Sequence, residues 1–260
     1  MTKNKTKRVL AIGDFHCGQR GGLTPPEFEP GGNYDPAHYN VRQMGWDFYQ
    51  ATVHRLKPDI VIFNGDAIDG KGFMSGGTEL IYTDRNIQVK MAVACLQAIP
   101  GNPKIVMAYG TGYHTGKRED WEDQIADLVG AEKIGGEDTI AVNGVVINYR
   151  HHLGRSSVPY ARHTAIAKEV LWNLLWAERG EYPKADILIR SHVHYHNYAG
   201  GVGWIGMTLP ALQGYVSKFG GRRMTGTIDF GLLHFDITSK EDYTWKSHIL
   251  RYPAAAVLSL

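Results

Sequence analysis

Short apolar runs rich in β-branched residues recur along the chain. They are VLAI at 9–12, IVIF at 60–63, IVMAY at 105–109, VVINY at 145–149 and ILI at 187–189. Apolar residues follow one another in these runs without alternating, which is typical of strands that are covered on both faces. Further strands are predicted at 203–209, 228–237 and 243–250.

The segments between the early strands have helical spacing. Helices are predicted over 41–56, 86–99 and 121–129, where apolar residues recur at three- and four-residue steps. A fourth helix is predicted to begin with Ser157 as its N-cap and to end near Glu178. Strands that alternate with helices predict an α/β domain.

Neither an internal repeat nor a low-complexity linker divides the chain, so we expect a single domain over residues 1–260. Residues 1–7 are expected to form a flexible tail. Residues 17–36 hold no predicted helix or strand, and a loop of this length is either a functional lid or a disordered insertion.

The composition says more about the cellular compartment of the protein than about its binding partner. Lys and Arg total 28 against 26 for Asp and Glu, so the net charge of +2 neither implies nor excludes nucleic acid. Cys17 and Cys95 form no disulfide framework, and no apolar run approaches the ~18 residues that span a bilayer. A cytoplasmic protein without membrane contact is the simplest expectation.

Each of the five early apolar runs is followed by Asp or His. The following residues are GDFH, NGDAID, GTGYH, RHH and RSHVHYH. In an open α/β sheet the ligand crevice lies at the carboxyl ends of the strands, so all five clusters can converge. Taken singly, an Asp after a strand is more often a turn former, and HVH can be a half-exposed strand. Taken together, the five clusters predict a metal site.

The spacing of these residues explains the chemistry. Asp14 and His16, and likewise His192 and His194, stand two residues apart and point to one side of an extended segment. Carboxylate and imidazole without thiolate suit manganese, iron or zinc. Asp66 is best placed to bridge two ions with its two oxygens. Two ions ~3.5–4 Å apart can hold a phosphoryl oxygen and lower the pKa of a shared water until hydroxide forms near neutral pH.

The blocks resemble, in order, those of the calcineurin-like metallophosphoesterases. D-x-H stands as DFH, G-D-x-x-D as GDAID, G-N-H as GTGYH, the isolated His as HH, and G-H-x-H as SHVH, over roughly residues 8–196. The resemblance implies two mixed β-sheets packed as a sandwich and flanked by helices, in four α/β/β/α layers.

The resemblance also implies roles for single residues. Two divalent ions are implied, manganese first, with iron or zinc as alternatives. His114 matches the histidine that contacts the substrate phosphate and can protonate the leaving oxygen. His151 is preferred over His152 as a ligand. The implied ligands are Asp14, His16 and His194 for the first ion, Asp66 as the bridge, and His151 and His192 for the second.

The chain departs from the family pattern after the third strand. The Asn that ligates the second metal in the family is missing, because Thr111, Gly112 and Tyr113 precede His114. Either Thr111 or a water substitutes, or His114 itself becomes a ligand. His196 is an extra histidine that we expect to be an exposed strand residue.

Several neighbouring residues have more than one interpretation. We expect Asp69 to orient its loop or to hydrogen-bond a ligand histidine, and Cys17 to pack in the interior. The nearby arginines either bind phosphate or are surface charges; they are Arg118, Arg150 and Arg155.

By resemblance, the chain is a metal-dependent phosphoesterase in which metal-bound hydroxide attacks phosphorus. Phosphodiesters are preferred as substrates by analogy, as for a nuclease or a nucleotide phosphodiesterase. A phosphomonoesterase is the first alternative. A non-catalytic interaction platform on the same fold is the second, and the missing Asn favours it weakly. The pattern sets neither the physiological substrate nor the oligomeric state.

Overall fold

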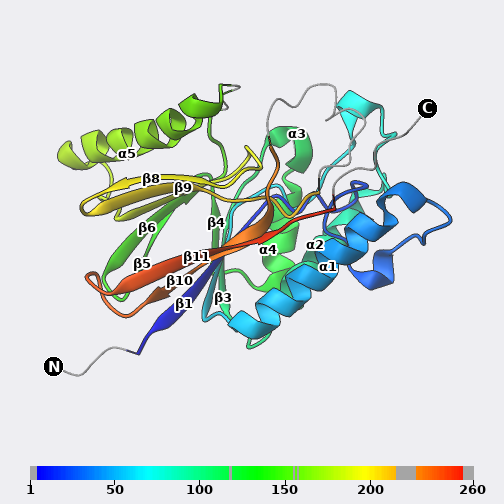
Figure 1. Ribbon diagram of the computed structural model, residues 1–260, viewed down its shortest axis with the longest axis horizontal. Coiled ribbons are helices and arrows are strands. Elements are labelled where there is room, and N and C mark those ends of the chain that lie inside the picture. Colours follow the sequence, from blue (N-terminus) through cyan, green and yellow to red (C-terminus); the bar gives the residue numbers. More distant parts are fainter. Residues whose placement is uncertain (1–4, 117–118, 155, 157, 215–226, 254–260) are drawn as a thin grey trace.

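A computed structural model describes residues 5–116, 119–154, 156, 158–214 and 227–253 (Figure 1). Its strands form two mixed sheets. The first has the order β11-β10-β1-β2-β3-β4 and the second β5-β6-β7-β9-β8. The strands of the first sheet are β1 (Lys7–Ile12), β2 (Ile60–Phe63), β3 (Lys104–Ala108), β4 (Lys133–Gly135), β10 (Phe230–Ile237) and β11 (Tyr243–Leu250). Those of the second are β5 (Asp138–Val142), β6 (Val145–Arg150), β7 (Ile187–Arg190), β8 (Asn197–Gly201) and β9 (Trp204–Thr208).

The strands of the first sheet are apolar throughout because each of their faces meets a different core. Val9 and Ala11 of β1 pack between the two sheets, whereas Leu10 and Ile12 face the helices. Successive side chains of a strand point to opposite faces, so burial on both sides requires an unbroken apolar run.

Helices cover the outer faces of both sheets (Figure 1). Tyr49 of α1, Met91 of α2 and Ile125 of α4 join the core on the first sheet, and Val170 of α5 packs on Leu188 of the second. The helices are α1 (Pro36–Leu56), α2 (Arg85–Gln97), α3 (Gly112–Thr115), α4 (Trp121–Val129) and α5 (Arg162–Glu178), with 3-10 turns η1 (Pro26–Phe28), η2 (Phe73–Ser75) and η3 (Pro159–Ala161). The expected sandwich of two mixed sheets flanked by helices is confirmed.

Some element boundaries differ from expectation. α1 begins at Pro36 instead of 41, because its first turn is polar and has no apolar stripe. α5 begins at Arg162 after η3, and its N-cap is Ala161 without a side-chain bond; Ser157 lies outside the described residues. Three short strands, β4, β5 and β8, were not predicted; β4 and β8 hold few apolar residues, whereas β5 holds three in its five residues.

The two segments expected to be loose are at least partly built into the fold. Residues 1–4 lie outside the described residues, whereas Lys7 pairs with Ile237 in the sheet. Residues 17–36 are described throughout. Within that segment, Glu29 and Asp35 bind the buried Arg42 at 2.8 and 2.9 Å.

Two further features concern the interior and the membrane. Cys17 and Cys95 are free and buried, and the fold brings their sulfur atoms within 4.0 Å of each other. Among the described residues, no helix has the length and apolarity that crossing a bilayer requires.

Candidate metal centre

The five clusters that follow the strands meet at one place. Their side chains form three groups in which the candidate ligand atoms lie within 4.8 Å of one another. These groups are Asp14 with His16 and His194, Asp66 with His151 and His192, and His16 with Asp66 and His114. His16 and Asp66 each belong to two groups. The fold therefore gathers the predicted ligands, with Asp66 between the others.

The backbone turns sharply at the candidate ligands. Asp14, His16, Asp66, His192 and His194 all have positive φ, between 45° and 72°. Non-glycine residues rarely adopt this left-handed conformation, and each costs of the order of 1–3 kcal/mol. Such strain concentrates at functional sites, where it directs side chains that a relaxed loop would point elsewhere.

The first group has the geometry of a ligand set. His194 Nε2 lies 3.1 Å from Asp14 Oδ1 and 3.2 Å from His16 Nε2. Among the described residues, Asp14 Oδ1 is buried without a hydrogen-bond partner, although the imidazole is so close. The two imidazole nitrogens can hydrogen-bond each other, which leaves Asp14 Oδ1 as the ligand atom without a partner in the part of the chain that the structure describes. A divalent cation between these atoms would satisfy all three residues.

The second group has a similar orphaned atom. His151 Nδ1 donates to the carbonyl oxygen of Asn64 at 2.7 Å, which leaves Nε2 as the free acceptor. Nε2 lies 3.1 Å from Asp66 Oδ2 and, in the described structure, has no hydrogen-bond partner. Two acceptors this close need a proton or a cation between them, so this group also fits a metal.

The charges of the cluster depend on one another. Burial opposes ionisation of Asp14 and Asp66, yet the neighbouring imidazoles hold the pKa of both carboxyl groups well below the usual range. Burial likewise opposes a charge on His16, but Asp14 and Asp69 raise its pKa to about 10. The buried carboxylates therefore require positive charge close by, which protons or metal ions can supply.

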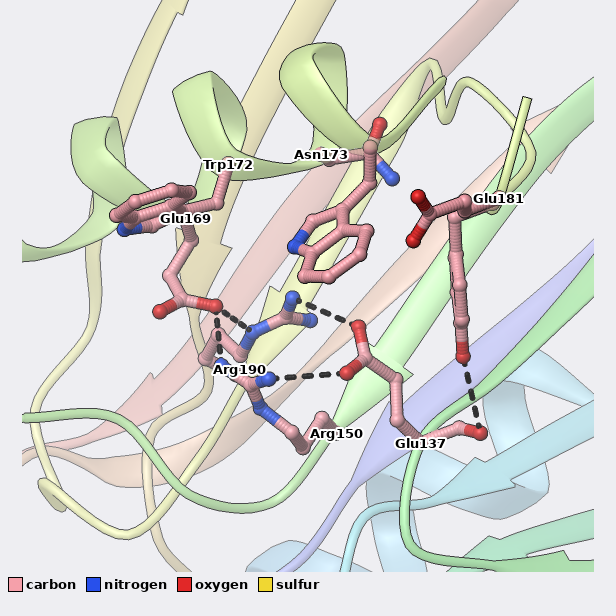
Figure 2. Close-up of a pocket in the computed structure, with 9 residues that line it drawn as sticks. Glu137, Arg150, Glu169, Trp172, Asn173, Glu181 and Arg190 are labelled. Carbon is pink, nitrogen blue, oxygen red and sulfur yellow. Dashed lines mark hydrogen bonds and ion pairs between the residues drawn. The ribbon is translucent and has the colours of Figure 1, made fainter. Parts of the chain in front are cut away.

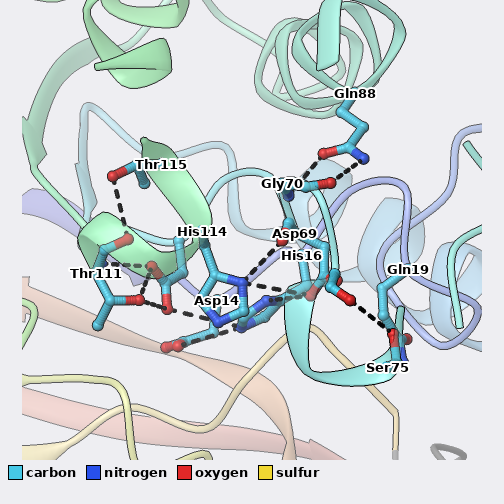
Figure 3. Close-up of polar contacts among 12 residues, drawn as sticks. Asp14, His16, Gln19, Asp69, Gly70, Ser75, Gln88, Thr111, His114 and Thr115 are labelled. Atoms are coloured by element: carbon cyan, nitrogen blue, oxygen red, sulfur yellow. Dashed lines mark hydrogen bonds and ion pairs between the residues drawn. The ribbon is translucent and has the colours of Figure 1, made fainter. Parts of the chain in front are cut away.

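His114 lies at the edge of the cluster and is oriented by Asp69 (Figure 3). Its Nδ1 donates to the backbone oxygen of Asp69 at 3.0 Å, while His16 Nδ1 lies 3.1 Å from Asp69 Oδ1. Asp69 thus contacts both rings, in agreement with the alternative in which it hydrogen-bonds a ligand histidine. Burial lowers the pKa of His114, so its ring favours the neutral form.

Thr111 contacts the bridging carboxylate directly. Its backbone N–H donates to Asp66 Oδ1 at 2.7 Å and its hydroxyl to the same oxygen at 3.1 Å. The Thr111 hydroxyl therefore stabilises the ionised carboxylate of Asp66 by donating a hydrogen bond to it. The grouping of His114 with His16 and Asp66 keeps His114 a candidate for the missing ligand position.

The remaining histidines are arranged unequally. His152 lies outside the three groups of described residues, with its ring centroid 4.9 Å from that of His192. Burial, together with the charge of His151, lowers the pKa of His192 to about 4. His196 is half-buried and hydrogen-bonds outside the three groups, because its Nδ1 donates to the backbone oxygen of Thr208 at 2.9 Å. The expectation that His196 is exposed is wrong.

Sequence reasoning missed Glu122, which is buried close to the site. Its two carboxylate oxygens accept hydrogen bonds from the backbone N–H groups of Ala67 at 2.9 Å and Gly110 at 2.6 Å. It therefore ties the loop after β2 to the loop after β3. Burial raises its pKa to about 8, and the charge of Asp66 acts in the same direction. An acidic residue on the same stripe as Ile125 and Ala126 was the available signal.

Of the three arginines near the predicted site loops, the structure describes Arg150. Arg150 forms ion pairs with Glu137 and Glu169 on the face of the second sheet that α5 covers. Arg118 and Arg155 lie outside the described residues.

No family model and no curated protein matches the chain. Similar solved structures include an archaeal phosphodiesterase, 14% identical with a TM-score of 0.48, over 94% of this chain and 99% of that one. Vps29 from Entamoeba histolytica in complex with Zn²⁺ is 13% identical with a TM-score of 0.44, over 93% and 98% of the two chains. A predicted phosphoesterase from Streptococcus pneumoniae is 10% identical with a TM-score of 0.40, over 94% and 99%.

The fold of this chain is a pair of mixed sheets with helices on both outer faces. Within that fold, the candidate ligands lie where strands of both sheets end.

Proposed function

We propose that this protein is a metal-dependent phosphoesterase with two ions held by one shared carboxylate. The observation that carries the proposal is the pair of buried acceptors, His151 Nε2 and Asp66 Oδ2, at 3.1 Å. Asp14 Oδ1 in the neighbouring group is likewise without a hydrogen-bond partner among the described residues. Buried orphaned ligand atoms in two groups favour two cations over a purely structural cluster.

Each residue has a definite task in this proposal. Asp14, His16 and His194 hold one ion, His151 and His192 hold the other, and Asp66 contributes to both sites. Nitrogen and oxygen donors without thiolate suit manganese, iron or zinc. Bound ions of this kind polarise a phosphoryl oxygen and make a water molecule easier to deprotonate.

His114 is proposed to act on the substrate. Because Nδ1 is engaged by the backbone of Asp69, Nε2 is the atom free to contact a phosphate oxygen. Nε2 carries no proton in the neutral ring, so the ring must be protonated to donate to a phosphate oxygen, and that proton can then be delivered to the leaving oxygen. Asp69 fixes the ring so that this atom faces the cluster.

We prefer phosphodiester substrates, as for a nuclease or a nucleotide phosphodiesterase, over phosphomonoesters. The deciding experiment measures bound metal in the purified protein after manganese loading, then compares hydrolysis of matched model monoesters and diesters. About two ions per chain and faster diester hydrolysis are expected. Fewer than one ion per chain would overturn the enzyme assignment, and a wide preference for the monoester would overturn only the diester preference.

A further inference from the structure

The helix that covers the second sheet, α5, is apolar on its outer face as well as its inner face. Its inner stripe, with Ile166 and Val170, is buried. On the outer side, Leu171 is 56% exposed and Trp172 is 58% exposed, and Leu175 is 47% exposed. A soluble helix normally carries polar residues on the face away from its sheet. A cluster of large apolar side chains there indicates a contact with another molecule.

The exposed residues form one straight stripe with a two-fold pattern. Lys168, Leu171, Leu175 and Glu178 are all exposed and follow one another at steps of three, four and three residues. Residues at this spacing lie on the same side of a helix. The pattern reads basic, apolar, apolar, acidic, and it is centred on Asn173. When two copies of this stripe lie antiparallel, basic residues therefore face acidic residues, and apolar residues face apolar residues.

This two-fold pattern favours a second copy of the chain as the molecule that binds the stripe. If a second copy lies antiparallel across the stripe, Leu171 of each copy meets Leu175 of the other. Lys168 of each copy then meets Glu178 of the other, so the ion pair forms twice. An interface in which residue i contacts j and j contacts i is the self-complementary arrangement of two-fold dimers.

Beside the stripe lies a pocket whose floor is held in place by ion pairs. Trp172 and Trp176 line a pocket of about 740 Å³, shown in Figure 2. Below them, the buried Arg190 binds Glu169 at 2.9 Å, and Arg150 binds Glu137 at 2.9 Å. These charges satisfy one another, so the floor of the pocket is fixed within the chain. The space between the tryptophans and this floor can receive side chains from a second copy.

The apolar area is of the size that a dimer uses. A buried aromatic side chain contributes roughly 150–250 Å². Trp172, Trp176 and the three leucines of this face can thus supply much of the ~800 Å² per protomer that a stable interface buries. Leu174 is the third leucine and is 36% exposed.

We propose that the outer face of α5 is a homodimer interface, in which two copies pair their α5 helices antiparallel about a two-fold axis that passes between Leu171 and Leu175. The face lies on the outside of the second sheet, whereas the candidate ligands lie at strand ends (Figure 1). The interface is therefore independent of the proposed reaction.

The test measures the mass of the full chain by sedimentation velocity over a range of concentrations. The wild type is expected to be a dimer, and Leu175→Glu to be a monomer. Lys168→Glu and Glu178→Lys are each expected to weaken the dimer at least tenfold by placing like charges opposite each other. The double variant Lys168→Glu with Glu178→Lys restores the pairing and is expected to recover the dimer.

Lys104→Glu is the matched control, because it makes the same charge change at an exposed residue of the first sheet. It is expected to leave the dimer unchanged. Circular dichroism and the melting temperature of each variant distinguish a lost interface from a lost fold. A monomeric wild type would overturn the proposal. A dimer that survives Leu175→Glu would also overturn it, and so would a double variant whose dimer is as weak as those of the single variants. Each of these results would overturn the proposal even if another protein were found to bind this face.

Discussion

Glu122 accepts a hydrogen bond from the backbone N–H of Ala67 at 2.9 Å, directly after the proposed bridging residue Asp66. The other carboxylate oxygen accepts from Gly110, next to Thr111. One buried side chain thus sets the distance between two loops that carry the site. It is a positioning residue, since it belongs to none of the three ligand groups.

Glu122→Gln is expected to weaken metal binding and turnover by roughly 10–100-fold, which is the usual effect of mutating residues that hold metal ligands in place. The amide has only one acceptor oxygen, so one of the two backbone N–H groups loses its bond at a cost of about 1–3 kcal/mol. Metal titration and the free energy of unfolding check this. Asp127→Asn removes an exposed carboxylate from the same helix and should change neither quantity. Unaltered metal affinity in Glu122→Gln would contradict the positioning role.

His151 and His152 allow a paired test of the second ligand group. His151 is buried and faces Asp66, whereas His152 is exposed and lies outside the groups of described residues. We expect His151→Ala to lose about one bound ion per chain and most turnover. His152→Ala should keep the metal content of the wild type. The reverse outcome would transfer the ligand role to His152.

Asp66→Asn tests the bridge through stability as well as activity. Manganese at about 100 times its dissociation constant should add about 2–3 kcal/mol to the free energy of unfolding of the wild type. The melting temperature should then rise by several degrees, and chelation should reverse the rise. Asp66→Asn is expected to lose most of this rise, and all measurable turnover, while its fold survives. A wild-type response in this variant would disprove the bridge.

His114→Gln separates a proton donor from a ligand. If His114 protonates the leaving group, the variant keeps its metal content and loses roughly 10²–10⁴-fold in turnover. The loss should be smaller for a substrate whose leaving group is already acidic. We expect this pattern, measured by metal analysis and by rates on a series of leaving groups. A parallel loss of metal would instead make His114 the replacement for the missing Asn.

His248 gives a pH dependence away from the metal site. Its Nε2 lies 2.9 Å from His234 Nδ1, and burial, with the charge of His234, lowers the pKa of His248 to about 4. An unfolded histidine has a pKa near 6.5, so the unfolded state binds more protons between these values. Stability is therefore complete above about pH 6.5 and is lost as the pH falls towards 4. His248→Gln should reduce this loss by at most about 1 kcal/mol, since the ring is partly solvated. Denaturant unfolding at several pH values measures the difference, and an identical profile in both proteins would refute it.

The sequence indicated the candidate ligands more clearly than the residue that holds their loops in place. Asp14, Asp66, His151 and His194 each stand within five residues after an apolar run, and this position made them candidates. Glu122 stands inside a helix among other acidic residues, where sequence alone favours a solvated face. Its burial depends on the packing of α4 against two loops from other parts of the chain.

The chain by itself determined the alternation of strands and helices and the residue types at the strand ends, because both follow from local hydrophobic spacing. The tertiary structure decided which atoms face one another. It left His151 Nε2 and Asp14 Oδ1 without hydrogen-bond partners in the described structure, and it brought Cys17 close to Cys95. Contacts between distant segments depend on how whole layers pack. Local spacing carries no record of that packing.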